Sequence, residues 1–287
     1  AARATGRGRT AMTTIALIDG DIFAYEVAAG SEEPINWGDG LWTLHAWEGP
    51  ARAALTERIE RLAEKVGATQ IIVALSDTEN WRKKLLPSYK ENRQFQRKPM
   101  LLKALKEHLR ESFEVCVRPG LEADDVLGIL ATWRGIRGEK VIVTKDKDLK
   151  TVPGLHYLAH KEDLGIFEIS PSEADDWHLI QTLAGDVSDG YSGCPGIGVE
   201  TARKIIEEPF GWEQYEHTFA SGKRAGETEL RWRKIEVATK WEAVVSHFIK
   251  AGLSEEEALT QARVARICRA CDYDFENEEV KLWNPTL

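Results

Sequence analysis

The sequence predicts an α/β protein in which a mostly parallel sheet with flanking helices is followed by an α-helical region. The first observation is that short apolar runs at residues 15–18, 71–75 and 141–143 alternate with segments of helical spacing. Strands that are apolar throughout are typical of a parallel sheet buried on both faces. The second observation is that the pattern is almost entirely helical from residue 171 onward.

Each further element is predicted from a local signal. Weaker apolar runs predict additional strands at residues 115–117, 155–158 and 166–169. A helix is expected over residues 50–66, because Pro50 suits a first helical position and Gly67 suits a helix end. Other helical stretches are expected at residues 122–133, 177–183, 202–206, 235–249 and 255–267.

The composition is that of a globular protein. The chain has 287 residues, a net charge of −9, 43% hydrophobic residues and 30% charged residues, which excludes collagen-like and wholly disordered chains. No apolar run approaches the roughly 20 residues that span a bilayer, so no membrane partner is expected. Four cysteines are too few for a disulfide framework, and the sequence therefore predicts a cytoplasmic protein.

The chain is expected to contain three parts. Residues 1–14 carry three arginines without an acid or a periodic pattern, and we interpret them as a tag-like or disordered terminus. Residues 15–170 form the predicted α/β domain, which includes a basic segment at 81–110. Residues 171–287 form the predicted helical region.

Acidic side chains follow three of the predicted strands. Asp19 follows the first strand, Asp77 the second, and Asp146 and Asp148 follow the strand at 141–143. Because the carboxyl ends of parallel strands share one edge of a sheet, we expect these side chains to converge. Taken singly, each group is more simply explained as the cap of a following helix. The recurrence at three strand ends favours a binding site.

Two more acidic groups join the prediction. One comprises Glu122, Asp124 and Asp125 at a predicted helix start, and the other comprises Asp186 and Asp189 in a glycine-containing turn. So many carboxylates at one edge repel each other unless cations neutralise them. Two Mg²⁺ ions, or Mn²⁺ in their place, suit an all-oxygen ligand set. Such a pair activates water and stabilises the leaving oxygen of a phosphate ester.

The basic segment 81–110 indicates a polyanionic partner. It contains ten Lys and Arg residues and two Glu residues, a local net charge of +8. Tyr89, Lys90 and Arg93 combine an aromatic ring with cations, as expected for contact with a base and a phosphate. A solvated basic helix is the simpler interpretation of such a charge run. The position of the segment directly after Asp77 favours the phosphate-binding interpretation.

A glycine turn before a predicted helix is the second informative motif. In residues 193–202, the Gly-x-Gly pair at Gly196 and Gly198 lets the backbone approach an anion closely. Alone, this pair is also compatible with a nucleotide-phosphate loop or a plain turn. Here it follows a helix instead of a strand, which favours a helix–turn–helix hairpin that binds a DNA backbone.

These motifs resemble, in order and in rough spacing, those of the 5′-nuclease (flap endonuclease) superfamily. Within this superfamily, the chain is most similar to the stand-alone 5′→3′ exonucleases of short-tailed lytic bacteriophages. The segments of this chain that resemble the phage branch are residues 80–83, 177–179, 189–193, 265–267 and 282–283. The superfamily motifs are Ile18-Asp19-Gly20, Asp77, Tyr89-Lys90 with Arg93, Glu122-Ala123-Asp124-Asp125, Thr144-Lys145-Asp146-Lys147-Asp148, and residues 185–190 with Pro195-Gly196-Ile197-Gly198.

The resemblance implies a PIN-like domain with a basic helical arch, a helix–three-turn–helix element at 178–208, and a role for each motif. In the family pattern, one tightly bound metal is held by Asp19, Asp77, Glu122, Asp124 and Asp146. A second metal is held by Asp148, Asp186 and Asp189, and Asp125 lies near it or between the two metals. Lys90 and Arg93 stabilise developing charge, and Tyr89 matches a stacking position. The candidate DNA-binding residues are Arg82, Lys83, Lys84, Arg97, Lys98, Gly196, Ile197, Gly198, Thr201 and Lys204, with a possible K⁺ ion at the glycine turn.

The implied activity is a metal-dependent 5′→3′ exodeoxyribonuclease that releases 5′-phosphorylated nucleotides from duplex DNA, and from RNA in RNA–DNA hybrids. The expected enzyme is a monomer that serves phage DNA replication, primer removal or recombination in the cytoplasm of an infected bacterium. A structure-specific 5′ flap endonuclease, a DNA-binding module without catalysis and a small PIN-type ribonuclease remain alternatives. The full set of carboxylates argues against a DNA-binding module without catalysis, and the glycine turn argues against a small PIN-type ribonuclease.

Overall fold

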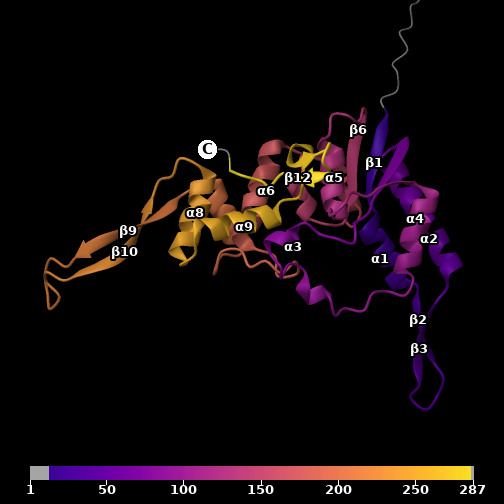
Figure 1. The fold of residues 1–287 in the computed structure, drawn as a ribbon, viewed down its shortest axis with the longest axis horizontal. Helices are drawn as coiled ribbons and strands as arrows, with labels where there is room; N and C mark the ends of the chain where they lie inside the picture. The colour runs from indigo at the N-terminus through magenta and orange to yellow at the C-terminus, as the bar shows by residue number, and fades with distance from the viewer. Residues whose placement is uncertain (1–12, 286–287) are drawn as a thin grey trace, which may run out of the picture. The chain divides into compact units, whose positions relative to one another are not determined.

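The computed structural model describes residues 13–285 and divides the chain into two compact units (Figure 1). Unit 1 contains residues 13–77 and 98–169, and unit 2 contains residues 78–97 and 170–285. The basic segment predicted at 81–110 is therefore divided between the units. Of the predicted tag-like terminus, residues 1–12 lie outside the described residues, and Thr14 already begins a strand.

Unit 1 is built on a six-stranded sheet, as the sequence predicts. Its strand order is β5-β4-β1-β6-β7-β8, and every neighbouring pair is parallel except β7 and β8. The strands span Thr14–Asp19 (β1), Gln70–Ala74 (β4), Glu114–Cys116 (β5), Glu139–Thr144 (β6), Gly154–Leu158 (β7) and Ile166–Ile169 (β8). Because β1 and its two neighbours are buried on both faces, their sequences are apolar without alternation.

Helices cover both faces of this sheet. On one face, α1 (Gly20–Gly30), α2 (Glu48–Lys65) and α4 (Leu102–Ser112) pack against the side chains of Ile18, Val73 and Val143. On the other face, α5 (Ala123–Thr132) packs against β1, β4 and β6. Short 3₁₀ helices span Asp148–Thr151 and Glu162–Leu164. The helices on the two faces thereby fix the positions of the strand ends.

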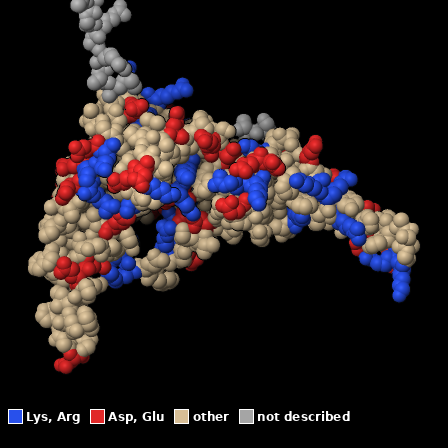
Figure 2. All heavy atoms as spheres, turned by 180° about the vertical axis from the view of Figure 1, so that it is seen from behind, with Lys and Arg blue, Asp and Glu red and all other residues tan. Residues whose placement is uncertain are grey.

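A hairpin that the sequence analysis did not predict lies between α1 and α2. It pairs β2 (Glu32–Asn36) with β3 (Trp42–Ala46) around a turn that contains Gly38, Asp39 and Gly40, all with positive φ. Trp37, Leu41 and Trp42 are exposed on it. Figure 2 shows this hairpin almost free of charged atoms, with acidic atoms at its tip. The glycine-containing turn at residues 38–40, with Trp37 before it and Trp42 and Thr43 after it, was the available sequence signal.

Unit 2 contains a helical core. The principal helices are α6 (Pro171–Ala184), α7 (Val199–Glu207), α8 (Lys240–Lys250) and α9 (Glu255–Ala265). They meet through buried side chains that include Leu183, Ile206, Val244 and Phe248. The segment 78–97 contributes α3 (Arg82–Leu85) and a 3₁₀ turn (Glu91–Arg93), and the C-terminal part contains a 3₁₀ turn (Ala270–Asp272), β11 (Tyr273–Asp274) and β12 (Glu279–Val280). No helix within residues 13–285 combines the length and apolarity that a membrane span requires.

The expectation of an almost wholly helical region after residue 170 was wrong. Strands β9 (Gly211–Thr218) and β10 (Thr228–Ile235) form a long antiparallel hairpin, and the helix expected at 235–249 begins at Lys240. Polar residues alternate with Tyr215, His217 and Phe219, and this period of two fits a strand. Figure 2 shows basic atoms at the outer end of this hairpin, where Lys223 and Arg224 lie in the connection.

The turn after α6 offers a matched test of the packing in unit 2. Gly193 and Gly196 both have positive φ, but a Cβ on Gly193 would collide with the backbone of Gly185 and Ala184, whereas one on Gly196 would meet nothing. We expect Gly196→Ala to cost about 1–2 kcal/mol from its backbone conformation alone. Gly193→Ala should cost roughly 1–3 kcal/mol more because of overpacking. Denaturant unfolding of both variants measures the difference, and equal stabilities would contradict the packing argument.

Candidate active site

The central strands of unit 1 bring three carboxylates to one edge of the sheet. Asp19 is the last residue of β1, Asp77 follows β4 by three residues, and Asp146 follows β6 by two. β1 lies between β4 and β6, parallel to both, and its register places Asp19 beside Ala74 at the end of β4. The convergence of these strand ends follows from the parallel topology.

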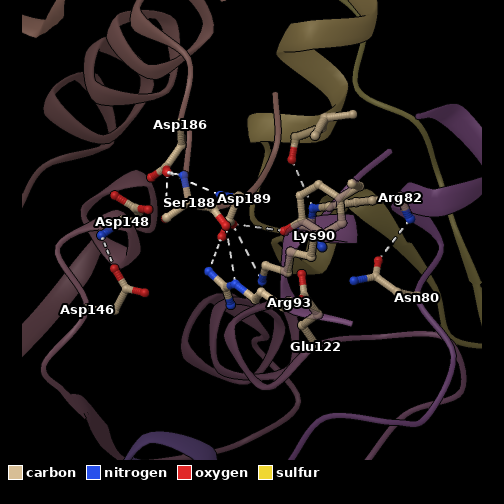
Figure 3. Close-up of polar contacts among 12 residues, drawn as sticks. Asn80, Arg82, Lys90, Arg93, Glu122, Asp146, Asp148, Asp186, Ser188 and Asp189 are labelled. Atoms are coloured by element: carbon tan, nitrogen blue, oxygen red, sulfur yellow. Dashed lines mark hydrogen bonds and ion pairs between the residues drawn. The ribbon is translucent and has the colours of Figure 1, made fainter. Parts of the chain in front are cut away.

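A chain of hydrogen bonds connects two of these strand ends. The Thr144 hydroxyl donates to Asp19 Oδ2 over 2.8 Å and accepts from the backbone N–H of Asp146 over 3.0 Å. Asp146 Oδ1 in turn accepts from the backbone N–H of Asp148 over 2.8 Å (Figure 3). The sequence analysis names Thr144 as the first residue of the motif 144–148 but gives it no role, and the structure shows that its hydroxyl links Asp19 to the backbone of Asp146.

The environment of Asp19 suits a bound cation. Its side chain is buried, and burial together with the charges of Asp21 and Asp146 raises the pKa of Asp19 to about 7, although hydrogen bonds from Thr144 and Ile22 act in the opposite direction. A divalent cation would remove this penalty by stabilising the ionised form. The carboxylates at this edge provide the hard oxygen ligands that Mg²⁺ and Mn²⁺ prefer. The chemistry of these donors therefore suits a divalent ion.

The start of α5 is tied to the end of β4. Asp77 Oδ2 accepts from the N–H of Gly120 over 2.7 Å, and Ser76 Oγ accepts from the N–H of Ala123 over 2.9 Å. These bonds hold Glu122 and the first turn of α5, which carries Asp124, at the end of β4. Asp125 is fully buried and accepts from the N–H of Glu122 over 3.3 Å, closing a capping box. The structure thus gives Asp125 a role in starting the helix.

The predicted metal-binding carboxylates do not converge on one point within the residues that the structure describes. Within residues 13–285, no three His, Cys, Asp or Glu side chains are grouped closely enough to hold one metal ion. Like charges repel, and several of these groups instead accept hydrogen bonds from neighbouring donors. Asp21, which lies outside the family pattern, forms an ion pair with Lys106 at 2.7 Å.

A second acidic group is organised within unit 2 by a tight turn. Asp186 Oδ1 accepts from the N–H of Ser188 over 2.7 Å, from the Ser188 hydroxyl over 2.6 Å and from the N–H of Asp189 over 3.3 Å. Gly190 has positive φ, and a Cβ there would lie 2.9 Å from the carbonyl oxygen of Ser88. The turn therefore packs directly against the backbone that leads to Tyr89 and Lys90.

The Asp189 carboxylate contacts all three residues predicted to act at the basic segment. Its Oδ1 accepts from Arg93 over 2.5 Å, and its Oδ2 lies 3.0 Å from the Tyr89 hydroxyl and 3.5 Å from Lys90 Nζ (Figure 3). Lys90 has a left-handed backbone with φ of 54°, an uncommon conformation for a residue with a side chain. The sequence analysis placed Tyr89, Lys90 and Arg93 together, but it did not indicate that the Asp189 carboxylate contacts all three.

Two predicted roles in the basic segment were wrong. Tyr89 is only 3% exposed and packs with Tyr191, Val264 and Ala265, so its ring is covered and cannot stack on a base. Arg82 is 2% exposed, and its guanidinium donates to the carbonyl oxygens of Val264 and Arg266 over 2.9 and 2.7 Å. It therefore anchors α3 to the end of α9 instead of contacting DNA.

The other predicted DNA-binding residues lie at or near the surface. The exposed ones are Lys83, Lys84, Arg97, Lys98, Gly196, Gly198, Thr201 and Lys204, whereas Ile197 is half-buried. Gly198 precedes α7 and provides no side chain to cap its first N–H groups. The start of α7 is therefore open to an anionic ligand.

Comparisons with known proteins extend these observations. Residues 14–156 match the model of the 5′-3′ exonuclease N-terminal resolvase-like domain. The chain is 36% identical to an exodeoxyribonuclease of Enterobacteria phage T3 and 35% identical to an exonuclease of Escherichia phage T7, each over 94% of this chain and 93% of the relative. A crystal structure of the T5 D15 protein with metal ions is similar in fold, with a TM-score of 0.51 and 19% identity over 68% of this chain and 74% of that one.

Proposed function

Because this chain belongs to the 5′–3′ exonuclease family, with relatives in phages T3 and T7, it is a hydrolase of the exonuclease class, and we propose that it degrades duplex DNA from 5′ ends. The observation that carries this proposal is the set of carboxylates at the ends of β1, β4 and β6. Metal-dependent hydrolysis of a phosphodiester uses such an acidic, cation-binding edge, whereas a passive DNA-binding module does not need one.

The proposed cofactor is Mg²⁺, for which Mn²⁺ can substitute. In unit 1, Asp19, Asp77, Glu122, Asp124 and Asp146 are the proposed ligands, with Asp148 beside them. The turn with Asp186 and Asp189 is proposed to bind a divalent cation in unit 2. When bound, such ions supply water activation and stabilisation of the leaving oxygen.

The protein's own residues supply the remaining chemistry. Lys90 and Arg93 are proposed to stabilise the negative charge that develops on the phosphate. Thr144 orients the Asp19 carboxylate through its hydroxyl group and holds the backbone of Asp146 beside it. The product of the proposed reaction is a 5′-phosphorylated nucleotide.

Duplex binding is proposed to involve a helix–three-turn–helix element at residues 178–208. It would consist of the end of α6, the glycine-containing connection and α7, with backbone N–H groups near Gly196 and Gly198 directed at a phosphate, and K⁺ is a possible ion there. Thr201 and Lys204 are exposed on α7 and support this role. Since phosphate contacts carry no base sequence, RNA in an RNA–DNA hybrid is a proposed substrate as well.

We propose that the enzyme acts as a monomer in the cytoplasm of an infected bacterium, in DNA replication, primer removal or recombination. Its similarity to exonucleases of phages T3 and T7 supports the phage setting.

A polarity assay tests the proposed function. The same duplex is labelled at the 5′ end in one sample and at the 3′ end in another, and digested with Mg²⁺ or with EDTA. We expect labelled mononucleotide at once from the 5′-labelled strand, gradual shortening of the 3′-labelled strand, and no product with EDTA. Early release of the 3′ label, or cleavage in EDTA, would refute the proposal. A duplex with a 5′ flap, if cut to long fragments, would indicate a flap endonuclease instead.

A further inference from the structure

The β9–β10 hairpin is a long arm of unit 2 that is anchored to α8 at its inner end. There, Trp212 Nε1 donates to His247 Nε2 over 3.1 Å, and the two rings pack edge to face. Figure 1 shows the strands running outward from α8. Each strand has eight residues and therefore spans roughly 26 Å. Because an isolated pair of strands is only marginally stable in water, the outer part of the arm needs stabilising contacts of its own.

One face of the hairpin supplies these contacts. Side chains two positions apart share a face of a strand, so Arg231 and Arg233 of β10 lie on the same face as Tyr215 of β9. Arg233 lies over the Tyr215 ring at 5.5 Å and forms an ion pair with Glu213. Arg231 forms an ion pair with Glu229 at 2.6 Å. On this face, which we call the arginine face, the positive charges are therefore matched by carboxylates of the hairpin itself.

The opposite face of the hairpin, which we call the tryptophan face, has a different character. It carries Trp212 and Glu216 from β9 and Leu230, Trp232 and Lys234 from β10. Leu230 is 62% exposed, and Trp232 is half-buried. Apolar side chains that stay exposed on an outward-running hairpin are typical of a binding surface.

Three lysines accompany the tryptophan face. Lys234 Nζ lies 3.8 Å from the centre of the Phe210 ring, and Lys250 Nζ of α8 lies 2.8 Å from the centre of the Trp212 ring. Lys223 is exposed in the connection between the strands. None of the three has a carboxylate partner among residues 13–285. An aromatic ring attracts a cation without neutralising it, so these charges remain available to an anion.

Exposed rings beside unneutralised cations match the chemistry of an unpaired nucleic acid strand. A single strand offers base faces that stack on aromatic side chains and phosphates that attract lysines. In a duplex the bases stack on one another, so it offers phosphates but no free base face for Trp232. The proposed reaction supplies such a strand, because digestion of one strand of a duplex leaves the other strand unpaired.

We propose that the tryptophan face of the β9–β10 hairpin binds single-stranded DNA, with a base stacked on Trp232 and phosphates at Lys234 and Lys250. This inference rests on the proposed function, which provides the unpaired strand. It goes beyond that function because it assigns a second DNA-binding surface, on a hairpin separate from the glycine turn and α7. Since every base has a stacking face, the surface binds without preference for base sequence.

The first test compares neighbouring cations on opposite faces. Binding of fluorescent oligo(dT) to the full chain is measured by anisotropy in EDTA over a range of salt concentrations. Lys234→Gln should weaken binding about threefold or more and lower the slope of log affinity against log salt by about 0.7. Arg233→Gln removes the same charge one residue away, on the arginine face, and should have a clearly smaller effect. Equal losses in the two variants, or no loss in Lys234→Gln, would overturn the proposal.

The second test separates stacking on Trp232 from its contribution to the hairpin. Valine and phenylalanine both favour strands, so Trp232→Val and Trp232→Phe should keep the hairpin, but only the second keeps a ring. We expect Trp232→Val to weaken oligo(dT) binding about fivefold or more and Trp232→Phe to retain most of the affinity. Blunt duplex of the same length should bind almost equally to both variants. Equal oligo(dT) affinity of the two variants, or an equal loss on duplex, would contradict the single-strand site.

These measurements separate this inference from the proposed function. If the hairpin has no single-strand site, the wild-type protein still digests duplex DNA from its 5′ ends, while Lys234→Gln and Trp232→Val bind oligo(dT) as wild type does. If the proposed function is wrong, the wild-type protein releases no nucleotide in the polarity assay, whatever the affinities for oligo(dT) are.

Discussion

Asp146→Asn is expected to reduce the single-turnover cleavage rate by at least about 10²–10³-fold while leaving the fold intact. Asparagine has nearly the same shape and keeps an oxygen that can accept from the N–H of Asp148. What it loses is the negative charge that the proposed metal site requires. The variant should unfold at or above the wild-type temperature, because the charge of Asp146 disfavours ionisation of the buried Asp19.

This prediction is checked with a 5′-labelled duplex at saturating enzyme, alongside DNA affinity measured by anisotropy in EDTA. DNA affinity should stay close to that of wild type, since Asp146 repels phosphate and contributes nothing to its binding. Asp163→Asn is a matched control that removes an exposed carboxylate from the same unit and should cleave normally. Full activity of Asp146→Asn would remove this residue from the proposed machinery.

The acidic edge could be predicted from the sequence because both of its causes are local. An apolar run predicts a buried strand, and the next polar residues must lie at its carboxyl end. Asp19, Asp77 and Asp146 therefore fall at neighbouring strand ends once the strands are parallel. The central six-stranded sheet was predictable for the same reason, since continuous apolar runs in alternation with helices favour parallel pairing.

The errors in the basic segment have a different physical origin. Whether a Tyr or Arg is solvent-exposed depends on what packs over it, and Tyr89 and Arg82 are covered by residues about 100 to 180 positions later in the chain, including Asp189 and Val264. No local pattern carries that information. Both residues are amphipathic, so composition alone fits a buried position as well as a ligand contact.

The β9–β10 hairpin shows a conflict between two local sequence signals. Over residues 211–235, charged residues are frequent enough to suggest an exposed helix, yet aromatic rings recur at a period of two. In the structure, Arg233 of β10 lies over the ring of Tyr215 of β9 at 5.5 Å, so charged residues pack across the hairpin. Cross-strand pairs of this kind stabilise a strand pair that charge frequency alone would not predict.

The other large effect is expected at Lys90. Its left-handed backbone makes most substitutions ambiguous, because strain in the loop would also lower the activity. Asparagine tolerates this conformation better than most residues do. Lys90→Asn therefore removes the ammonium group while the loop keeps its path and its backbone bond to Asp189.

We expect Lys90→Asn to lower the single-turnover rate by roughly 10²–10³-fold, the effect of removing one preorganised group that stabilises transition-state charge. Its unfolding free energy should change by only about 1 kcal/mol, because the 3.5 Å ion pair with Asp189 and the contact with the Tyr89 ring at 5.0 Å are each weak, and Asp189 keeps Arg93 and the Tyr89 hydroxyl. Lys90→Arg, which keeps the charge, should recover part of the rate. If Lys90→Asn and Lys90→Arg cleave equally fast, the positive charge at this position has no part in the reaction.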